Sequence, residues 1–213
     1  MRITRLGHAC LLVEGTDIRV LIDPGGFSDA RHVLEDADVV LVTHQHADHV
    51  DTENVAPLVA RTGARVWAEG AVVPLLATNG VEAHAAAPGQ HIDLGSLQVD
   101  VTGGTHAEIY ESIPRIGNLG YVLSETNGPR LYHPGDSYEY PLSGIDVLAL
   151  PLTAPWARMA MTAEFLAAVT PSRAFPIHDA IVNGTGWSLY MRLCREVTGM
   201  SLDPVRPDGS LDL

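Results

Sequence analysis

The sequence contains no lysine, so all 13 of its basic residues are arginine. Without a lysine amine, Schiff-base chemistry and lysine nucleophiles are excluded. Only two cysteines are present, and the wide separation of Cys10 and Cys194 favours two free core thiols over one disulfide. No apolar run reaches the roughly 18 residues that a membrane helix needs. The apolar run at 9–13 is also too brief for a signal-peptide core, so we predict a cytoplasmic protein without a membrane span.

Positive charge is scarce as well, because 26 acidic residues against 13 basic ones give a formal net charge of -13. Such a surface disfavours extended contact with nucleic acid or with an anionic membrane. A local phosphate site stays open, because bound divalent cations would reverse the local sign of charge. We therefore expect a small-molecule substrate as the partner, and nothing in the sequence decides between a monomer and a homo-oligomer.

The chain of 213 residues is long enough for one large domain, and no linker, repeat or shift in composition divides it. We therefore predict a single domain over residues 1–213. Apolar periodicity predicts strands at residues 3–6, 9–13, 18–22, 38–43, 65–68, 91–94, 97–102, 119–124, 130–132, 146–150 and 173–177. Helical spacing predicts helices at 52–61, with Asp51 as N-cap, and at 71–78, 162–169 and 186–197, while the tail at 204–213 can add a short edge strand. This order indicates an α/β (α+β) fold in which two sheets pack together with helices outside.

The densest group of potential ligands is the motif THQHADH at residues 43–49, directly after a predicted buried strand. Side chains repeat every two residues on an extended segment, so His44 and His46 point the same way. A following turn can aim Asp48 and His49 at an adjacent position. Imidazole and carboxylate donors suit zinc, iron or manganese, so one short segment can begin two metal sites. A solvated histidine cluster is the alternative interpretation.

Three further donors follow predicted strands elsewhere in the chain. His106 comes after the strand at 97–102 and the flexible link Gly103-Gly104, Asp136 after the strand at 130–132, and His178 after the strand at 173–177. Each alone is an ordinary loop residue, but as a set at strand ends they are expected to converge. The predicted metal ligands are His44, His46, Asp48, His49, His106, Asp136 and His178.

The ordered set of Asp23, the HxHxDH motif at 44–49, His106, Asp136 and His178 resembles the metallo-β-lactamase-fold hydrolases. The segments LGHAC at 6–10 and YHPGD at 132–136 resemble the L-ascorbate-6-phosphate lactonase-like branch of that superfamily. The resemblance covers essentially the whole chain. It implies a four-layer αββα sandwich with the metals at one edge of the sheets.

The resemblance also implies a role for each matching residue. Two divalent metal ions, zinc or manganese first and iron as a further option, are the expected cofactors. Asp136 would bridge them, and Asp23 would order the loops that carry the ligands. The first metal would be bound by His44, His46 and His106, and the second by Asp48, His49 and His178.

Two divalent ions about 3.5–4 Å apart can share a water and lower its pKa towards ~7, and the metal-bound hydroxide then attacks a carbonyl or phosphoryl centre. Asp48 or Asp136 is the catalytic group expected to orient this nucleophile and accept its proton. The expected reaction is hydrolysis of a small ester, lactone or phosphate-bearing metabolite. A metal-dependent phosphodiesterase or nuclease is the alternative enzyme, and a non-catalytic metal-binding protein is the alternative outside catalysis.

Four residues near these ligands have two interpretations each. Trp156 and Arg158 lie in a loop after the predicted strand at 146–150, where specificity is often set. Trp156 either stacks on a substrate ring or caps the core, and Arg158 either holds an anionic group such as phosphate or is solvated. His8 and His133 lie in the segments shared with the resembled branch. Each of them either supports the ligands or donates a proton, or it is a satisfied structural histidine.

Overall fold

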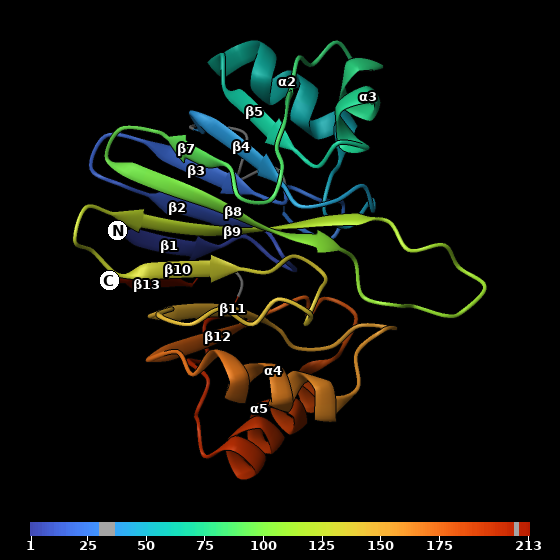
Figure 1. The fold of residues 1–213 in the computed structure, drawn as a ribbon, viewed down its shortest axis with the longest axis vertical. Coiled ribbons are helices and arrows are strands. Elements are labelled where there is room, and N and C mark those ends of the chain that lie inside the picture. Colours follow the sequence, from blue (N-terminus) through green and yellow to red (C-terminus); the bar gives the residue numbers. More distant parts are fainter. Residues whose placement is uncertain (30–36, 207–208) are drawn as a thin grey trace.

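The computed structural model describes residues 1–29, 37–206 and 209–213. Two β-sheets lie face to face, and helices cover the outer side of each (Figure 1). The order of layers confirms the predicted αββα sandwich. Both cysteines are buried and free, as expected. Among the described residues, no helix combines the length and apolar character needed to cross a membrane.

The first sheet has seven strands in the order β13-β1-β2-β3-β4-β5-β6. Their bounds are β1 Arg2–Arg5, β2 Leu11–Glu14, β3 Arg19–Ile22, β4 Val39–Val42, β5 Arg65–Ala68, β6 His84–Ala85 and β13 Ser210–Asp212. The strands from β13 to β3 pair antiparallel, and those from β3 to β6 pair parallel. The predicted tail strand is β13, at the edge of this sheet. Two residues are too few to show a period, which is why the sequence does not predict β6.

The second sheet has six strands in the order β12-β11-β10-β9-β8-β7. Their bounds are β7 His91–Asp93, β8 Leu97–Thr105, β9 Gly117–Glu125, β10 Arg130–His133, β11 Val147–Pro151 and β12 Arg173–Ile177. The strands from β7 to β10 are antiparallel, whereas β10, β11 and β12 are parallel. Strands β11 and β12 are almost fully buried, as parallel strands covered on both faces should be.

Helices α2 (Thr52–Thr62) and α3 (Val72–Ala77) cover the first sheet, and α4 (Met159–Val169) and α5 (Gly184–Thr198) cover the second (Figure 1). The carboxylate of Asp51 accepts hydrogen bonds from the backbone amides of Glu53 and Asn54, which confirms it as the N-cap of α2. The left-handed conformation of Gly63 ends the same helix. Helix α4 begins three residues before the predicted start.

The apolar core lies between the sheets and is continued by one apolar layer under each helix pair. Leu41, Leu97 and Phe175 are fully buried between the sheets. Leu58 of α2 packs on the first sheet, and Phe165 of α4 packs on the second. Burial of each such side chain contributes about 1.5–3 kcal/mol. This packing fixes the two sheets against each other and so fixes where the strand ends meet.

The hairpin of β8 and β9 is longer than the sequence predicts. Gly103 and Gly104, interpreted as a flexible link, instead continue β8 and pair with Leu119 and Asn118. A Cβ on Gly103 would lie 2.6 Å from the backbone oxygen of Asn118, so glycine permits close strand pairing there. The prediction of a flexible link is wrong, because strand pairing overrides the intrinsic freedom of glycine. The loop at 106–116 therefore projects from the end of a rigid hairpin (Figure 1).

The strands that precede the predicted ligands all end at one edge of the sandwich. Strands β1, β3 and β4 of the first sheet and β8, β10 and β12 of the second run in the same direction, towards the right in Figure 1. Their carboxyl ends carry the segments that contain His8, Asp23, the motif at 43–49, His106, Asp136 and His178.

Candidate metal centre

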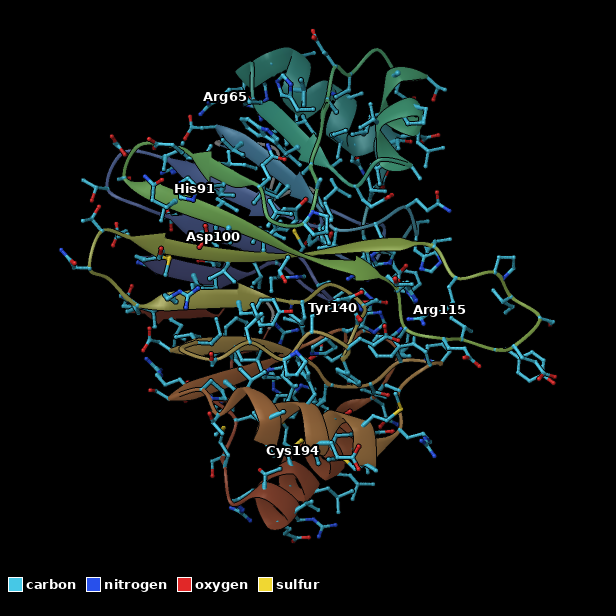
Figure 2. The ribbon with its side chains drawn as sticks, in the orientation of Figure 1. Arg65, His91, Asp100, Arg115, Tyr140 and Cys194 are labelled. Carbon is cyan, nitrogen blue, oxygen red and sulfur yellow. The ribbon has the colours of Figure 1, made fainter. Side chains whose placement is uncertain are left out.

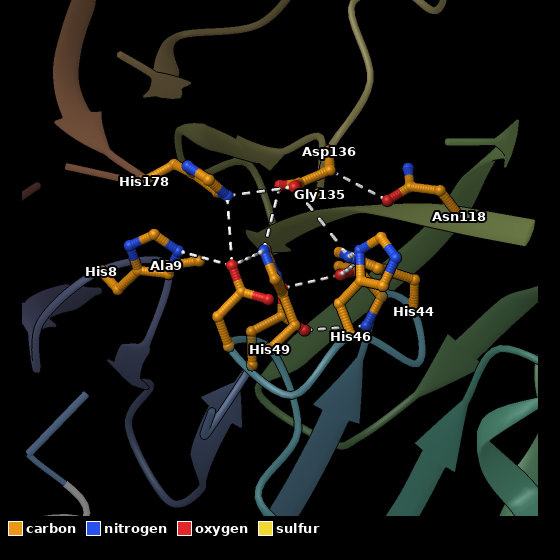
Figure 3. Close-up of polar contacts among 12 residues, drawn as sticks. His8, Ala9, His44, His46, His49, Asn118, Gly135, Asp136 and His178 are labelled. Atoms are coloured by element: carbon orange, nitrogen blue, oxygen red, sulfur yellow. Dashed lines mark hydrogen bonds and ion pairs between the residues drawn. The ribbon is translucent and has the colours of Figure 1, made fainter. Parts of the chain in front are cut away.

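Two groups of histidine and aspartate side chains gather at this edge (Figure 3). Within each group, one potential ligand atom per residue lies within 4.8 Å of all the others. The first cluster consists of His44, His46, His106 and Asp136. The second cluster consists of His8, Asp48, His49 and His178. The structure thus brings all seven predicted ligands together, in the grouping that the resemblance implies, and adds His8 to the second cluster.

Four buried polar atoms at the centre of this arrangement have no hydrogen-bond partner. They are the Nε2 atoms of His49, His106 and His178 and the Oδ1 atom of Asp136. An unsatisfied buried polar atom costs about 1–3 kcal/mol, so four in one place are expensive for the protein alone. Neutral imidazole and ionised carboxylate are the donors that bind divalent metals, and nitrogen and oxygen together suit zinc, manganese or iron. The residues therefore fit two divalent ions.

Asp136 lies between the two clusters. Its Oδ1 is 3.1 Å from His49 Nε2, and its Oδ2 is 3.0 Å from His178 Nε2 and 3.5 Å from His106 Nε2. Burial alone would raise the pKa of Asp136, but His49 and His178 hold it well below its usual range. The carboxylate is therefore ionised and reaches both clusters, as a bridging ligand must.

The turn that presents Asp136 is held by residues outside the clusters. The side-chain oxygen of Asn118 accepts a hydrogen bond from the Asp136 amide at 2.9 Å, and the indole Nε1 of Trp156 donates to Asp136 Oδ2 at 3.1 Å. Gly135 has φ 61°, and a Cβ there would lie 2.3 Å from the side-chain oxygen of Asn118. No local pattern in the sequence singles out Asn118, because only strand register places it beside this turn.

Asp23 supports ligands of both clusters from behind. One oxygen accepts from the Thr43 amide at 2.8 Å, and the other lies 2.7 Å from both Thr43 Oγ1 and His49 Nδ1. Because carboxylate accepts, His49 carries its proton on Nδ1 and its Nε2 is left to bind a metal. Thr43 Oγ1 also lies 2.9 Å from His44 Nδ1, which extends the same support to the first cluster.

His178 is held by an ion pair in the interior of the protein. It adopts the left-handed region with φ 54°, and its Nδ1 donates to the carbonyl of Thr153 at 2.8 Å. The next residue, Asp179, accepts from the fully buried Arg5 at 2.6 Å and from Trp187 Nε1 at 2.8 Å. The sequence gives no signal for this network, because Arg5 and Asp179 lie 174 positions apart.

The clusters differ in the protonation that their surroundings favour. Burial lowers the pKa of His178, but Asp136 and Asp48 outweigh it and raise that pKa to about 9. In the first cluster, burial and neighbouring histidines lower the pKa values of His44 and His46. Without metal, His178 of the second cluster therefore holds a proton that a metal would displace, while His44 and His46 of the first cluster are neutral.

His8 and His133 occupy different positions relative to the ligands. His8 Nδ1 accepts from the Ala180 amide at 3.4 Å, so its Nε2 carries the proton that it donates to Asp48 Oδ2 at 3.1 Å. His8 in this state orients Asp48 and is not itself a ligand. His133 donates to the carbonyl of Ala9 at 2.9 Å and accepts from the Gly135 amide at 3.2 Å, so it joins the Asp136 turn to the N-terminal segment.

A cavity of about 200 Å³ opens onto the two clusters. Besides ligands of the clusters, it is lined by Ile109, Pro155 and Trp156. Trp156 is 6% exposed, so it forms a wall of the cavity in addition to its hydrogen bond with Asp136. Arg158 is exposed at the start of α4 and is not among the lining residues.

Comparisons with known proteins agree with this arrangement. The family model described as the beta-lactamase superfamily domain matches residues 2–178. The chain is 36% identical to protein Rv0786c of Mycobacterium tuberculosis over 200 residues, which are 93% of each chain. It is 32% identical over 194 residues to a UPF0173 metal-dependent hydrolase of Carboxydothermus hydrogenoformans, with 84% of each chain covered.

The fold is shared with solved structures of much lower sequence identity. The metallo-beta-lactamase fold protein YhfI of Bacillus subtilis superposes with a TM-score of 0.78 at 12% identity, over 99% of both chains. The sandwich, the two clusters at its edge and the matches along the sequence agree with one another. The chain belongs to the beta-lactamase superfamily, and within it to the UPF0173 family of metal-dependent hydrolases.

Proposed function

We propose that this protein is a binuclear metal-dependent hydrolase of a small ester, lactone or phosphate-bearing metabolite. The observation that carries the proposal is the set of four unpartnered buried atoms around Asp136, which touches both clusters. Loss of ligands would favour a non-catalytic protein, but all seven predicted ligands are present and lie within the two clusters. The cavity beside the clusters gives a small substrate access to them.

When bound, two divalent ions would lower the pKa of a water and polarise the substrate oxygen. Asp48 is the carboxylate of the second cluster and lines the cavity with its side chain 23% exposed. It is therefore placed to orient the attacking water and to accept its proton. The hydrogen bond from His8 keeps Asp48 in this orientation.

Asp136 and Trp156 have complementary parts in the reaction. Asp136 contacts both clusters, so it holds them at a defined spacing. Trp156 fixes one of its oxygens and excludes water from the adjacent wall of the cavity. The lactonase-like assignment is favoured over a nuclease by the net charge of -13, which repels a polyanion.

The test is an assay of purified protein reloaded with Mn²⁺ or Zn²⁺ against a lactone, an ester and a phosphodiester. We expect metal-dependent cleavage of the lactone or the ester, and its loss in His46→Ala and Asp136→Ala. Circular dichroism should show that both variants stay folded. Phosphodiester cleavage alone would favour the alternative enzyme, and cleavage of none of the three would favour a non-catalytic protein.

His91→Ala is the matched control, because it also removes an imidazole. His91 is exposed and pairs with Asp100 on the second sheet. In Figure 2 this pair lies to the left, away from Arg115 and Tyr140 on the side where the β8–β9 loop projects. The turnover of His91→Ala should equal that of the unmodified protein. Full activity in His46→Ala or Asp136→Ala would contradict the binuclear mechanism.

A further inference from the structure

We infer that the substrate is neutral and presents a short apolar group to the cavity, rather than a phosphate-bearing metabolite. This inference rests on the proposed hydrolase function and narrows its substrate class. It is carried by the apolar wall of the metal cavity, by the lack of a lining arginine among the described residues and by the small volume of the cavity.

The wall of the cavity is apolar wherever it is not a cluster residue. Its lining consists of five residues of the two clusters together with Ile109, Pro155 and Trp156. A substrate whose reacting group meets the clusters must place its remaining atoms against these three side chains. Such a surface stabilises hydrocarbon by desolvation and offers a charged group no hydrogen bonds in return.

No arginine lines this cavity among the residues that the structure describes. Arg115 lies on the same loop as Ile109, but its guanidinium donates twice to the carbonyl of His106 and pairs with Glu139. The loop also carries the exposed acidic residues Glu108 and Glu111. A phosphate group held away from the metals would therefore meet the apolar wall instead of the arginine fork that usually binds it.

A second cavity, of about 410 Å³, lies on the other side of His8 and contains Arg206. It does not supply a phosphate site for the metal cavity. Its Arg206 guanidinium stacks 3.8 Å above the centre of the Trp187 ring, and Asp29 and Asp179 line the same space. His8 lines this second cavity and His178 lines the metal cavity, and the centroids of the two rings are 4.0 Å apart.

The metal cavity is also small. Its volume of about 200 Å³ is below the ~300–1,000 Å³ of pockets that enclose drug-sized ligands. Half-buried Ile109 and the Trp156 ring close it on the apolar side. A short acyl chain or a small lactone ring fits this space, whereas a long acyl chain would have to leave it.

The charge test compares δ-valerolactone with glucono-1,5-lactone and its 6-phosphate on the metal-loaded protein. We expect kcat/KM for the two neutral lactones to exceed that for the phosphorylated lactone by about tenfold or more, since no arginine among the described residues lines the cavity to offset the phosphate charge. Calorimetric titration with δ-valerolactam, which is not turned over, gives a second readout. The lactam should bind. The affinity for glucose 6-phosphate should exceed that for glucose by no more than inorganic phosphate alone accounts for.

Ile109→Arg should weaken or abolish this selectivity by placing a cation in the wall. We expect the ratio of neutral to phosphorylated lactone to fall about tenfold, with weaker δ-valerolactam binding and unchanged metal content. Ile113→Arg is the matched control, because it adds the same charge to the same loop at a residue that is 47% exposed and outside the cavity. Its ratio should stay unchanged.

The size test compares 4-nitrophenyl acetate with 4-nitrophenyl octanoate. The acetate should be cleaved with the higher kcat/KM, and Ile109→Ala should narrow the difference by enlarging the cavity. Preference of the unmodified protein for the phosphorylated lactone, or an equal shift in both arginine variants, would overturn the inference alone. If no lactone or ester is cleaved while the metals are bound, the proposed function fails as well.

Discussion

The two clusters of the metal centre are built in different ways. In the first, His44 and His46 follow the end of β4. His106 directly follows β8, which pairs with β9 along its whole length. In the second, His178 adopts a left-handed backbone and is anchored through the buried pair of Arg5 and Asp179. Both clusters thus use strand ends, but the second also depends on a buried ion pair that joins the N-terminal strand to the segment after β12.

This difference indicates that the two metal sites can be weakened separately. Asp136 touches residues of both clusters, and Asp23 touches His49 directly and His44 through Thr43, so changes at either carboxylate should affect both sites. Arg5 pairs with Asp179, which follows His178 of the second cluster, and it also donates to the carbonyl of Val205, which belongs to neither cluster. Metal content measured at each site therefore tests whether the two sites weaken separately, which turnover alone does not.

The largest selective effect is expected for Arg5→Met. It leaves Asp179 buried and without its cation, and loss of one partner of a buried ion pair costs about 3–5 kcal/mol. We expect urea unfolding to show this loss, and metal titration to show weaker binding at the second site only. Arg2→Met is the control, because the Arg2 side chain is 55% exposed and pairs only with exposed or half-exposed acids.

Lower global stability could hide weaker metal binding at the second site, so a second variant separates these two effects. Adding Asp179→Asn to Arg5→Met removes the uncompensated charge and should recover part of the free energy of unfolding. The second site should stay weak in this double variant, because His178 still lacks its anchor. Equal weakening of both sites would contradict the separation of the clusters.

Asp23→Asn should weaken both sites. An amide keeps one acceptor oxygen, but its nitrogen cannot accept from Thr43 Oγ1 and His49 Nδ1. Loss of a group that orients metal ligands typically costs about 10–100-fold in metal affinity. Competition with a chelator would measure this loss of metal affinity. Asp38→Asn, at an exposed residue, is the control. Weakening of only one site would show that Thr43 does not transmit the support to His44.

Trp156→Phe should have a smaller effect centred on Asp136. It keeps an aromatic wall but removes the hydrogen bond to Asp136 Oδ2, and such bonds to charged groups are worth about 1.5–3 kcal/mol. We expect lower metal affinity, with a KM change smaller than the kcat change. A change in KM alone would assign Trp156 to substrate contact only.

The smallest effect should appear in the pH dependence of the metal-free protein. The pKa of His178 is raised from 6.5 to about 9, so its stabilising charge is fully present below pH 6.5 and is lost as the pH rises towards 9. The lowered pKa values of His44 and His46 act below pH 6.5, where protonation favours the unfolded chain. The melting temperature should therefore fall between pH 6.5 and 9, and His178→Gln should flatten that fall.

The sequence by itself determined most of the elements and the chemical types of the ligands. Period-two and β-branched runs predict the strands, and the HxHxDH motif places four donors within six residues, so local order alone indicates metal chemistry. His106, Asp136 and His178 are predicted because each follows a strand, and parallel strand ends meet at one edge. Such signals are local along the chain, so they survive without knowledge of the packing.

Only the tertiary structure decided which groups support those ligands. Sheet register and packing, which no local pattern records, create three such pairs: Arg5 with Asp179, His8 with Asp48, and Asn118 with Asp136. The same holds for Gly103, whose close approach to Asn118 makes it part of a strand instead of a flexible link. These contacts join segments far apart in the chain, and their geometry exists only once the two sheets have packed.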